Sequence, residues 1–259
     1  MNSTSTKNRT ARFVEVDFLR GAAVLMMIVF HFIFDLNYLD LVKFTLDSFF
    51  WITFERITAT VFIFLVGVSL QLSYLRHQQA GELISFYKRN VVRAISLIFF
   101  ALLITLVTRL YSPGSYIFFG VLHFIAVAIL LALPLVRYHF ANLVLGLIFP
   151  ILGIFLPLFL GESLSNHLSL IFWNQNLNTL DYFPLLPWFG FVLLGIFFAK
   201  LAYKNFKRQF SFNFTWLQNN KIGAFGALLG RNSLWIYLLH QPVIVGVLMV
   251  LSKIINPIF

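Results

Sequence analysis

The sequence predicts an all-α membrane protein, a bundle of about seven transmembrane helices. Of its 259 residues, 60% are hydrophobic and 11% are charged, whereas a soluble domain is nearer half apolar and a quarter charged. Several apolar runs reach the twenty or so residues that cross a bilayer as a helix. These runs are continuous and do not alternate over short segments, which excludes a transmembrane barrel.

Seven stretches are long and apolar enough to be membrane spans. We expect them, in chain order, at residues 17–38, 49–74, 87–110, 115–136, 139–160, 184–203 and 228–252. Together they form one domain over residues 17–252, with a polar cytoplasmic tail at 1–16 and a short tail at 253–259. The polar start and the charged first span predict no removable signal peptide.

The segments between the spans contain recognisable turns. Ser112-Pro113-Gly114 predicts a tight turn between the third and fourth spans. Pro150 and Pro157 lie within the fifth span, where neighbouring helices tolerate a kink. The polar, Asn-rich segment 161–183 either covers a cavity or is a solvated loop.

The distribution of Lys and Arg predicts the orientation. With the N-terminus in the cytoplasm, the outer segments hold only Lys43, Arg56, Arg109 and Lys253. The inner segments then hold Lys7, Arg9, Arg12, Arg76, Lys88, Arg89, Arg93, Arg137, Lys200, Lys204, Lys207, Arg208, Lys221 and Arg231. Cytoplasmic loops are rich in these residues. We therefore expect a cytoplasmic N-terminus and an extracytoplasmic C-terminus, and attribute most of the net charge of +10 to topology.

Two further features bear on partners and cofactors. Segment 200–227 interleaves basic and aromatic residues, a pattern that can bind single-stranded nucleic acid. Beside membrane spans such residues lie at lipid headgroups, so we expect membrane lipids and no nucleic acid as partners. The absence of cysteine excludes disulfides, thiolate nucleophiles and cysteine-based metal sites. We expect no metal and no tightly bound cofactor.

The first span carries four ionisable residues on one stripe. Asp17, Arg20, His31 and Asp35 fall within roughly 60° of one another at about 100° per residue. Ionisable groups inside a membrane are costly and face a protein interior or a water-filled cavity. We therefore interpret this stripe as the wall of a site.

Polar residues of other spans are expected at overlapping depths. They are Glu55 and Arg56 on the second span, His123 on the fourth, Trp188 at the start of the sixth, and His240 and Gln241 beside Pro242 on the seventh. These groups either pair with one another to hold the bundle together or line a functional cavity. We favour the cavity, because so many buried ionisable groups would otherwise be a needless desolvation cost.

The cytoplasmic end of the first span is suited to a phosphate. Gly230-Arg231-Asn232-Ser233 is expected to begin the last span, where backbone N–H groups and Arg231 meet at a helix N-terminus. Simple snorkelling of Arg231 to the interface is the alternative. Arg20 and His31 lie about 16 Å apart along a helix, a length comparable to an extended pantetheine arm. Arg20 holding phosphate and His31 meeting a thioester would suit an acyl-CoA donor.

These residues also carry a family resemblance. The chain resembles the bacterial heparan-alpha-glucosaminide N-acetyltransferase-like catalytic-domain family in the segments VDFLRGAAVLMMIVFHFIFDL, FIFLVGVSLQLS, GVLHFIAVAILLALP, DYFPLLPWFGFVLLGI and LGRNSLWIYLLHQPV, spread from residue 16 to 243. Arg20 and His31 also resemble the first-helix motif of membrane acyltransferases that modify surface polysaccharides. The resemblance implies an Arg on the CoA phosphates and an essential His. In the lysosomal branch that His lies between the first two core helices, but residues 39–50 of this chain contain none.

The leading hypothesis is a transmembrane acyltransferase in a bacterial inner membrane. It moves an acetyl or other short acyl group from cytoplasmic acyl-CoA to a hydroxyl or amine of an extracytoplasmic glycan or lipid-linked sugar. Each candidate residue has an expected role: catalysis by His31, Asp35, His123 and Glu55; donor binding by Asp17, Arg20, Arg231, Asn232 and Ser233; acceptor binding by Arg56, Trp188, His240 and Gln241.

His31 is expected to act as a base oriented by Asp35, as a carboxylate orients histidine in a serine-protease triad. Direct transfer and an acyl-His intermediate both remain open, as does a homo-oligomer. Two alternatives use the same polar residues: a proton-coupled carrier and a non-catalytic membrane subunit.

Overall fold

A computed structural model describes residues 13–174, 177–211 and 214–255. Within these ranges the chain is helical and no strand forms; its one β-type pairing is an isolated bridge between Phe119 and Tyr182. The elements are α1 (Val14–Tyr38), α2 (Phe49–Gln79), α3 (Leu83–Tyr111), α4 (Val121–Ala132), α5 (Phe140–His167), α6 (Leu185–Ala202), η1 (Lys204–Phe206), α7 (Thr215–Asn219), α8 (Lys221–Arg231) and α9 (Ser233–Ile255). Of the two predicted tails, residues 1–12 and 256–259 lie outside the described residues.

Six helices are long and apolar enough to cross a membrane. They are Val14–Tyr38, Phe49–Gln79, Leu83–Tyr111, Phe140–Phe159, Leu185–Ala202 and Ser233–Ser252. α4 is also apolar but shorter, with 12 residues. The predicted all-α membrane bundle of about seven helices is therefore confirmed. The orientation of the two termini stays a prediction.

The fourth predicted span, residues 115–136, is only partly helical. Residues 112–120 form a turn and an extended stretch, and α4 is complete within Val121–Ala132. The extended stretch bonds to a distant segment, with Leu180 N–H donating to the Ser115 carbonyl and Phe183 N–H to that of Phe119. Apolar composition alone predicted a longer helix because it does not register these tertiary hydrogen bonds.

The last predicted span, residues 228–252, is in fact two helices. α8 ends at Arg231, because the backbone N–H of Asn232 bonds to the carbonyls of Leu228 and Leu229 and its side chain also donates to Leu228. α9 begins only at Ser233. The prediction that Gly230 and Arg231 begin the last span is therefore wrong, since both lie in the final turn of α8.

The described residues divide into two compact units. One holds the chain up to Phe62 together with residues 214–255, and the other runs from Ile63 to Ser211. This division does not test the single domain expected over residues 17–252, because α2 continues from the first unit into the second without a break.

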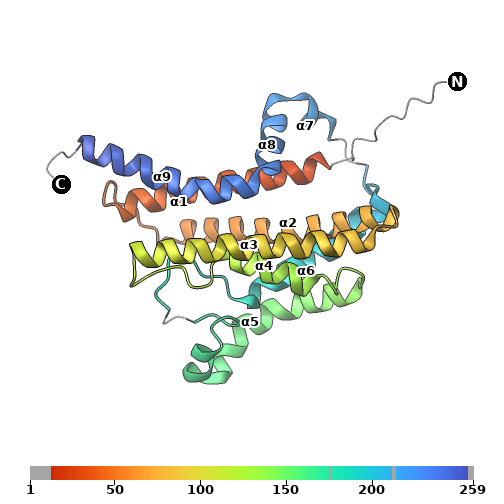
Figure 1. Cartoon of the computed structure of the whole chain (residues 1–259), viewed down its shortest axis with the longest axis horizontal. Helices are drawn as coiled ribbons and strands as arrows, with labels where there is room; N and C mark the ends of the chain where they lie inside the picture. Colours follow the sequence, from red (N-terminus) through yellow and green to blue (C-terminus); the bar gives the residue numbers. More distant parts are fainter. Residues whose placement is uncertain (1–12, 175–176, 212–213, 256–259) are drawn as a thin grey trace. The chain divides into compact units, whose positions relative to one another are not determined.

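In the first unit, α1 and α8 approach closely through glycines. A Cβ on Gly21 would lie 1.9 Å from the carbonyl oxygen of Gly226, and one on Gly230 would lie 1.7 Å from that of Asp17. Figure 1 shows α8 against the N-terminal half of α1, as the contacts between these helices require. Glycine at these positions lets the end of α8 reach the backbone of α1 beside Asp17.

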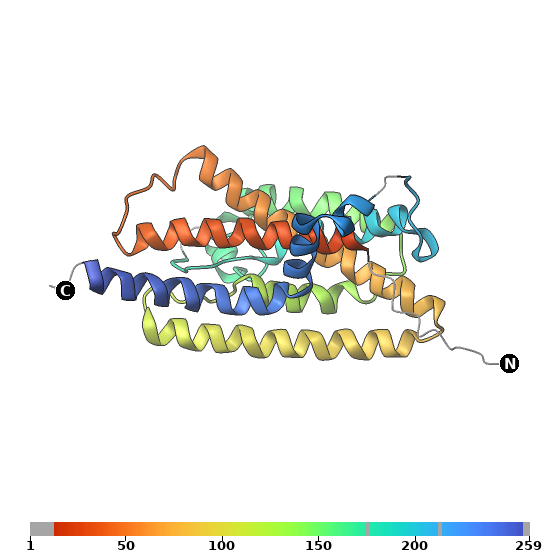
Figure 2. The ribbon, with the colours of Figure 1, turned by 90° about the horizontal axis from the view of Figure 1, so that it is seen from above.

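α9 follows α1 in the same direction in the first unit. Three contacts establish this direction, since the residue number increases along α1 and along the α8–α9 segment from one contact to the next. They are Asp17 with Arg231, His31 with His240 and Asp35 with Gln241. The two helices lie side by side in both views (Figures 1 and 2). The polar stripe of α1 therefore faces the α8–α9 segment over about 18 residues, or roughly 27 Å at 1.5 Å per residue.

The second unit also has close helix contacts at glycine. A Cβ on Gly67 of α2 would lie 2.0 Å from the Val192 carbonyl oxygen, and one on Gly195 of α6 would lie 2.1 Å from that of Phe64. α5 packs along α6, where a Cβ on Gly190 would lie 2.4 Å from the ring of Pro150. Small residues at helix contacts are typical of membrane bundles, in which close backbone packing drives association.

Segment 161–183, for which two interpretations were open, makes specific contacts in its described part. The Asn178 amide donates to the Gly114 carbonyl at 3.0 Å, and an Asp181 carboxylate oxygen accepts from the Val121 backbone N–H at 2.9 Å. The Tyr182 hydroxyl donates to the Phe172 carbonyl at 2.7 Å, and burial raises the pKa of Tyr182 to about 12. These hydrogen bonds show that the segment packs against the start of α4 and is more than a solvated loop.

Candidate active site

Three charged side chains gather where α1 meets the end of α8. The Asp17 carboxylate lies 3.3 Å from the Arg20 guanidinium and 3.4 Å from Nε of Arg231. Arg20 also donates to the Gly230 carbonyl at 3.2 Å, at the C-terminal end of α8, where the helix dipole favours a cation. The sequence predicted all three as donor-binding residues, and the structure brings them together.

These three side chains together carry a net positive charge of one, because Asp17 contributes one negative charge and Arg20 and Arg231 contribute one positive charge each. The side chains of Asp17 and Arg20 are 11% and 21% exposed, whereas Arg231 is 47% exposed. Arg231 therefore presents nearly half of its side chain to the surroundings. An anion that reaches this end of α1 meets Arg231 first and competes with Asp17 for both cations.

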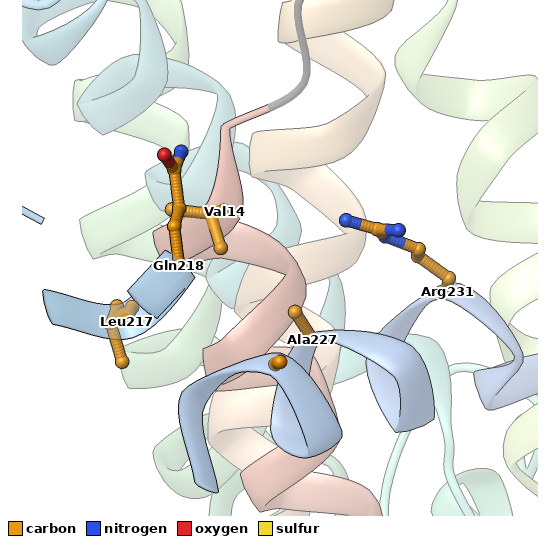
Figure 3. A pocket seen from close by; sticks show the side chains of 6 residues that line it. Val14, Leu217, Gln218, Ala227 and Arg231 are labelled. Carbon is orange, nitrogen blue, oxygen red and sulfur yellow. The ribbon is translucent and has the colours of Figure 1, made fainter. Parts of the chain in front are cut away.

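A pocket of about 240 Å³ lies beside Arg231. It is lined by Val14, Leu217, Gln218, Ala224, Ala227 and Arg231, from α1, α7 and α8. Figure 3 shows Arg231 on one side of this pocket, with Leu217 and Gln218 on the other. Its lining is mainly apolar, with one amide and one guanidinium.

Asn232 and Ser233 lie at the junction of α8 and α9. The Asn232 amide caps the end of α8 by donating to the Leu228 carbonyl at 2.9 Å. Ser233 is the first residue of α9. The helix N-terminus predicted here is therefore that of α9, which begins after Arg231. The roles of Asn232 and Ser233 in binding the donor stay predictions.

Further along α1, two histidines lie against each other. The ring centroids of His31 and His240 are 5.0 Å apart, with the ring planes at 57°. Nδ1 of His240 is 2.6 Å from the Tyr237 carbonyl oxygen, and its Nε2 is buried without a hydrogen-bond partner among the described residues. An apolar pocket of about 330 Å³ adjoins this pair and is lined by His240, Ile28, Trp235, Ile236, Leu239, Val243 and Ile244.

Asp35 has a different partner from the one expected. Its carboxylate is 2% exposed and accepts from the Gln241 amide at 2.9 and 3.0 Å. In the described part of the chain it makes no hydrogen bond to His31. The amide nitrogen of Gln241 faces the carboxylate, so the amide oxygen of Gln241, Oε1, points away from it. This oxygen is buried and has no hydrogen-bond partner among the described residues.

Glu55 and Arg56 are close to the start of α2 in the first unit. Both side chains are exposed, and neither takes part in the ion pairs found among the described residues. Their predicted roles in catalysis and acceptor binding therefore stay predictions.

The remaining candidates, His123 and Trp188, belong to the second unit. Nε2 of His123 is 3.3 Å from the Thr105 hydroxyl of α3, and its ring lies beside Phe119. The ring centroids of Trp188 and Phe183 are 4.9 Å apart. The buried Nε1 of Trp188 has no hydrogen-bond partner in the described part of the chain.

Sequence reasoning passed over Gln71. This α2 residue is fully buried, and neither atom of its amide has a hydrogen-bond partner in the part of the chain described. An amide in the mainly apolar second half of the span was the signal that could have identified it, since buried polar groups are nearly always paired. Thr105, the partner of His123, carried no such signal.

The fold and the buried polar residues define a polytopic helical membrane protein with ionisable groups inside its spans. A model of the family described as heparan-alpha-glucosaminide N-acetyltransferase, catalytic, matches residues 12–242. The chain belongs to this family, which places it among transmembrane acetyltransferases and confirms the resemblance inferred from its motifs. No curated protein and no solved structure matches the chain.

Proposed function

We propose that the protein transfers an acetyl or other short acyl group from cytoplasmic acyl-CoA to an extracytoplasmic acceptor in a bacterial inner membrane. The acceptor is a hydroxyl or amine of a glycan or lipid-linked sugar. The observation that carries the proposal is the order of groups along α1. A basic cluster at Arg20 and a histidine pair at His31 are separated by eleven residues, about 16 Å of helix.

The donor phosphates bind at the basic end in this proposal. Arg20 and Arg231 form charge-assisted hydrogen bonds to phosphate, which are stronger than those between neutral groups. Asp17 holds both guanidinium groups near each other before the donor arrives. The pantetheine arm then runs along α1 and brings the thioester to His31.

The transfer takes place at the histidine end in this proposal. His31 takes the proton of the acceptor hydroxyl or amine as that group attacks the thioester carbonyl. Asp35, one turn further along the stripe, accepts a hydrogen bond from the Gln241 amide. This bond positions the part of α9 that directly precedes Pro242. The apolar pocket beside His240 has the chemistry to receive an acyl chain.

The experiment that tests this function removes His31. In purified protein reconstituted into liposomes, His31→Ala should lower transfer from labelled acetyl-CoA by about 10²- to 10⁴-fold, the range of general acid–base catalysis. The variant should still insert and bind CoA, which thermal stabilisation by CoA measures. Full activity of His31→Ala would sink the assignment of this residue, and no stabilisation of the wild type by CoA would remove the donor.

A further inference from the structure

The imidazole of His240 is held in one tautomer by the backbone. Its Nδ1 lies 2.6 Å from the Tyr237 carbonyl oxygen. Since a carbonyl oxygen can only accept, Nδ1 must carry the hydrogen. Neutral His240 therefore has its lone pair on Nε2, and the tautomer follows from the hydrogen bond.

Nε2 of His240 is a buried acceptor that no described residue satisfies. The residue is 9% exposed, so water does not readily replace a protein partner. Leaving such an atom unpaired costs about 1–3 kcal/mol. Buried polar atoms without partners are rare in proteins and require an explanation, of which a catalytic role is one.

Two rings lie beside His240: that of His31, with centroids 5.0 Å apart, and that of Tyr237 at 5.5 Å. The nearby Asp35 carboxylate accepts two hydrogen bonds from the Gln241 amide. His31 and His240 therefore face each other as two imidazoles, with no carboxylate bonded to either ring in the described residues.

His77 of α2 shows that the backbone hydrogen bond alone does not produce this arrangement. It is 4% exposed, and its Nδ1 lies 2.7 Å from the Ser73 carbonyl oxygen, as Nδ1 of His240 lies near that of Tyr237. The ring beside it, however, is Phe86. What distinguishes His240 is the combination of a second imidazole ring at a centroid distance of 5.0 Å and a buried Nε2 that no described residue bonds.

We propose that His31 and His240 form a two-imidazole proton relay, which rests on the acyl transfer proposed above. The acceptor oxygen or nitrogen forms a bond to the acyl carbon, and its proton passes to His31. The bond between the acyl carbon and sulfur breaks, and the sulfur leaves with the electron pair. A rotation of the His31 ring brings one of its nitrogens within hydrogen-bond distance of Nε2 of His240, to which it passes the proton, and His240 delivers this proton to the sulfur. Both rings begin and end neutral, and no other reactant is consumed.

The test uses a substitution that keeps the structural hydrogen bond. In His240→Asn the amide nitrogen occupies nearly the place of Nδ1 and can still donate to the Tyr237 carbonyl, while Nε2 is lost. The relay predicts that kcat for acetyl transfer falls by about 100-fold or more, with little change in KM for acetyl-CoA. The matched control is His77→Asn, which should leave kcat unchanged.

A double variant tests whether the two rings act as one unit. The double variant with His31→Asn and His240→Asn should have about the same kcat as the less active of the two single variants. Once one imidazole of a relay is removed, removing the other causes little further loss. If the fold-loss in kcat of the double variant instead equals the product of the two single fold-losses, the two rings act independently and the relay is overturned.

The remaining outcomes separate the relay from the proposed function. Activity of His240→Asn equal to wild type, while wild type is active, overturns the relay alone. A wild type that transfers no acyl group overturns the proposed function and the relay with it. Should His240→Asn not fold, His240→Gln takes its place, because it keeps an amide near Nε2 but transfers no proton. Failure of both variants to fold makes His240 a structural residue and overturns the relay.

Discussion

Asp17 offsets part of the positive charge at the end of α1 that we propose binds the donor, which we call the proposed donor end. One carboxylate lies 3.3 Å from Arg20 and 3.4 Å from Arg231, so it both positions these cations and competes with any phosphate for them. Because the three side chains are partly exposed, the ion pairs themselves contribute little to the free energy of unfolding. The main effect of Asp17 is therefore expected on binding.

Asp17→Asn should consequently bind CoA more tightly. Removing the negative charge of Asp17 ends its competition with phosphate for the two guanidinium groups, and we expect Kd for CoA to fall by roughly tenfold, or about 1.4 kcal/mol. Arg20→Gln should raise Kd by at least a similar factor, since it removes a charged donor. Isothermal titration calorimetry of the detergent-solubilised protein with CoA measures both changes.

The control for the loss of one positive charge in Arg20→Gln is Arg89→Gln on an exposed position of α3. It should leave Kd unchanged, because Arg89 belongs to the second unit and is not part of the Asp17 cluster. Weaker CoA binding by Asp17→Asn than by wild type would contradict the competition between carboxylate and phosphate.

Among the elements, α8 determines whether the proposed donor end forms. Its glycines bring the α8 backbone against that of α1, and the Gly230 carbonyl accepts from Arg20. The packing of α8 on α1 therefore also determines the position of the Arg20 guanidinium. A side chain at this contact would separate the helices and move Arg231 away from Asp17.

Gly21→Ala and Gly230→Ala should both destabilise the protein. The added Cβ would lie 1.9 Å and 1.7 Å from backbone oxygens, which cannot move aside as a flexible side chain would. Overpacking of this kind costs about 1–3 kcal/mol. Thermal unfolding in detergent should show a lower Tm, and CoA binding should weaken in parallel.

Gly246→Ala in α9 is the matched control, because apart from its own turn of helix no atom of the described residues lies within 4 Å of its added Cβ. Its Tm should equal or exceed that of the wild type, since alanine favours a helix over glycine. Equal Tm values for all three variants would show that the close α1–α8 contact does not exist.

At the scale of the whole molecule, hydropathy predicted most of the helices and failed where tertiary contacts decide. The long apolar runs around Phe62 and Leu97 became helices as expected. Residues 115–120 are equally apolar but bond to residues 180–183 and stay extended. α8 was divided by the prediction between the inner segment 200–227 and the last span 228–252. Its three glycines lower its helix propensity, and close packing on α1 offsets that cost.

The candidate site shows the same division between what a pattern can and cannot predict. Helical spacing correctly placed Asp17, Arg20, His31 and Asp35 on one stripe, and the structure faces that stripe with α8 and α9. Spacing could not identify partners: Asp35 was expected to orient His31 but bonds to Gln241. Side-chain pairing between helices depends on their relative rotation, which a single sequence does not contain.

The central claim is that acyl groups pass from CoA at one membrane face to an acceptor at the other. Sealed inside-out membrane vesicles containing the protein present the cytoplasmic face to the medium, so labelled acetyl-CoA added outside tests it directly. The account predicts label on an envelope glycan or lipid-linked sugar inside the vesicles, and none with His31→Ala. Label that reaches no enclosed component, or that appears equally with His31→Ala, would contradict it.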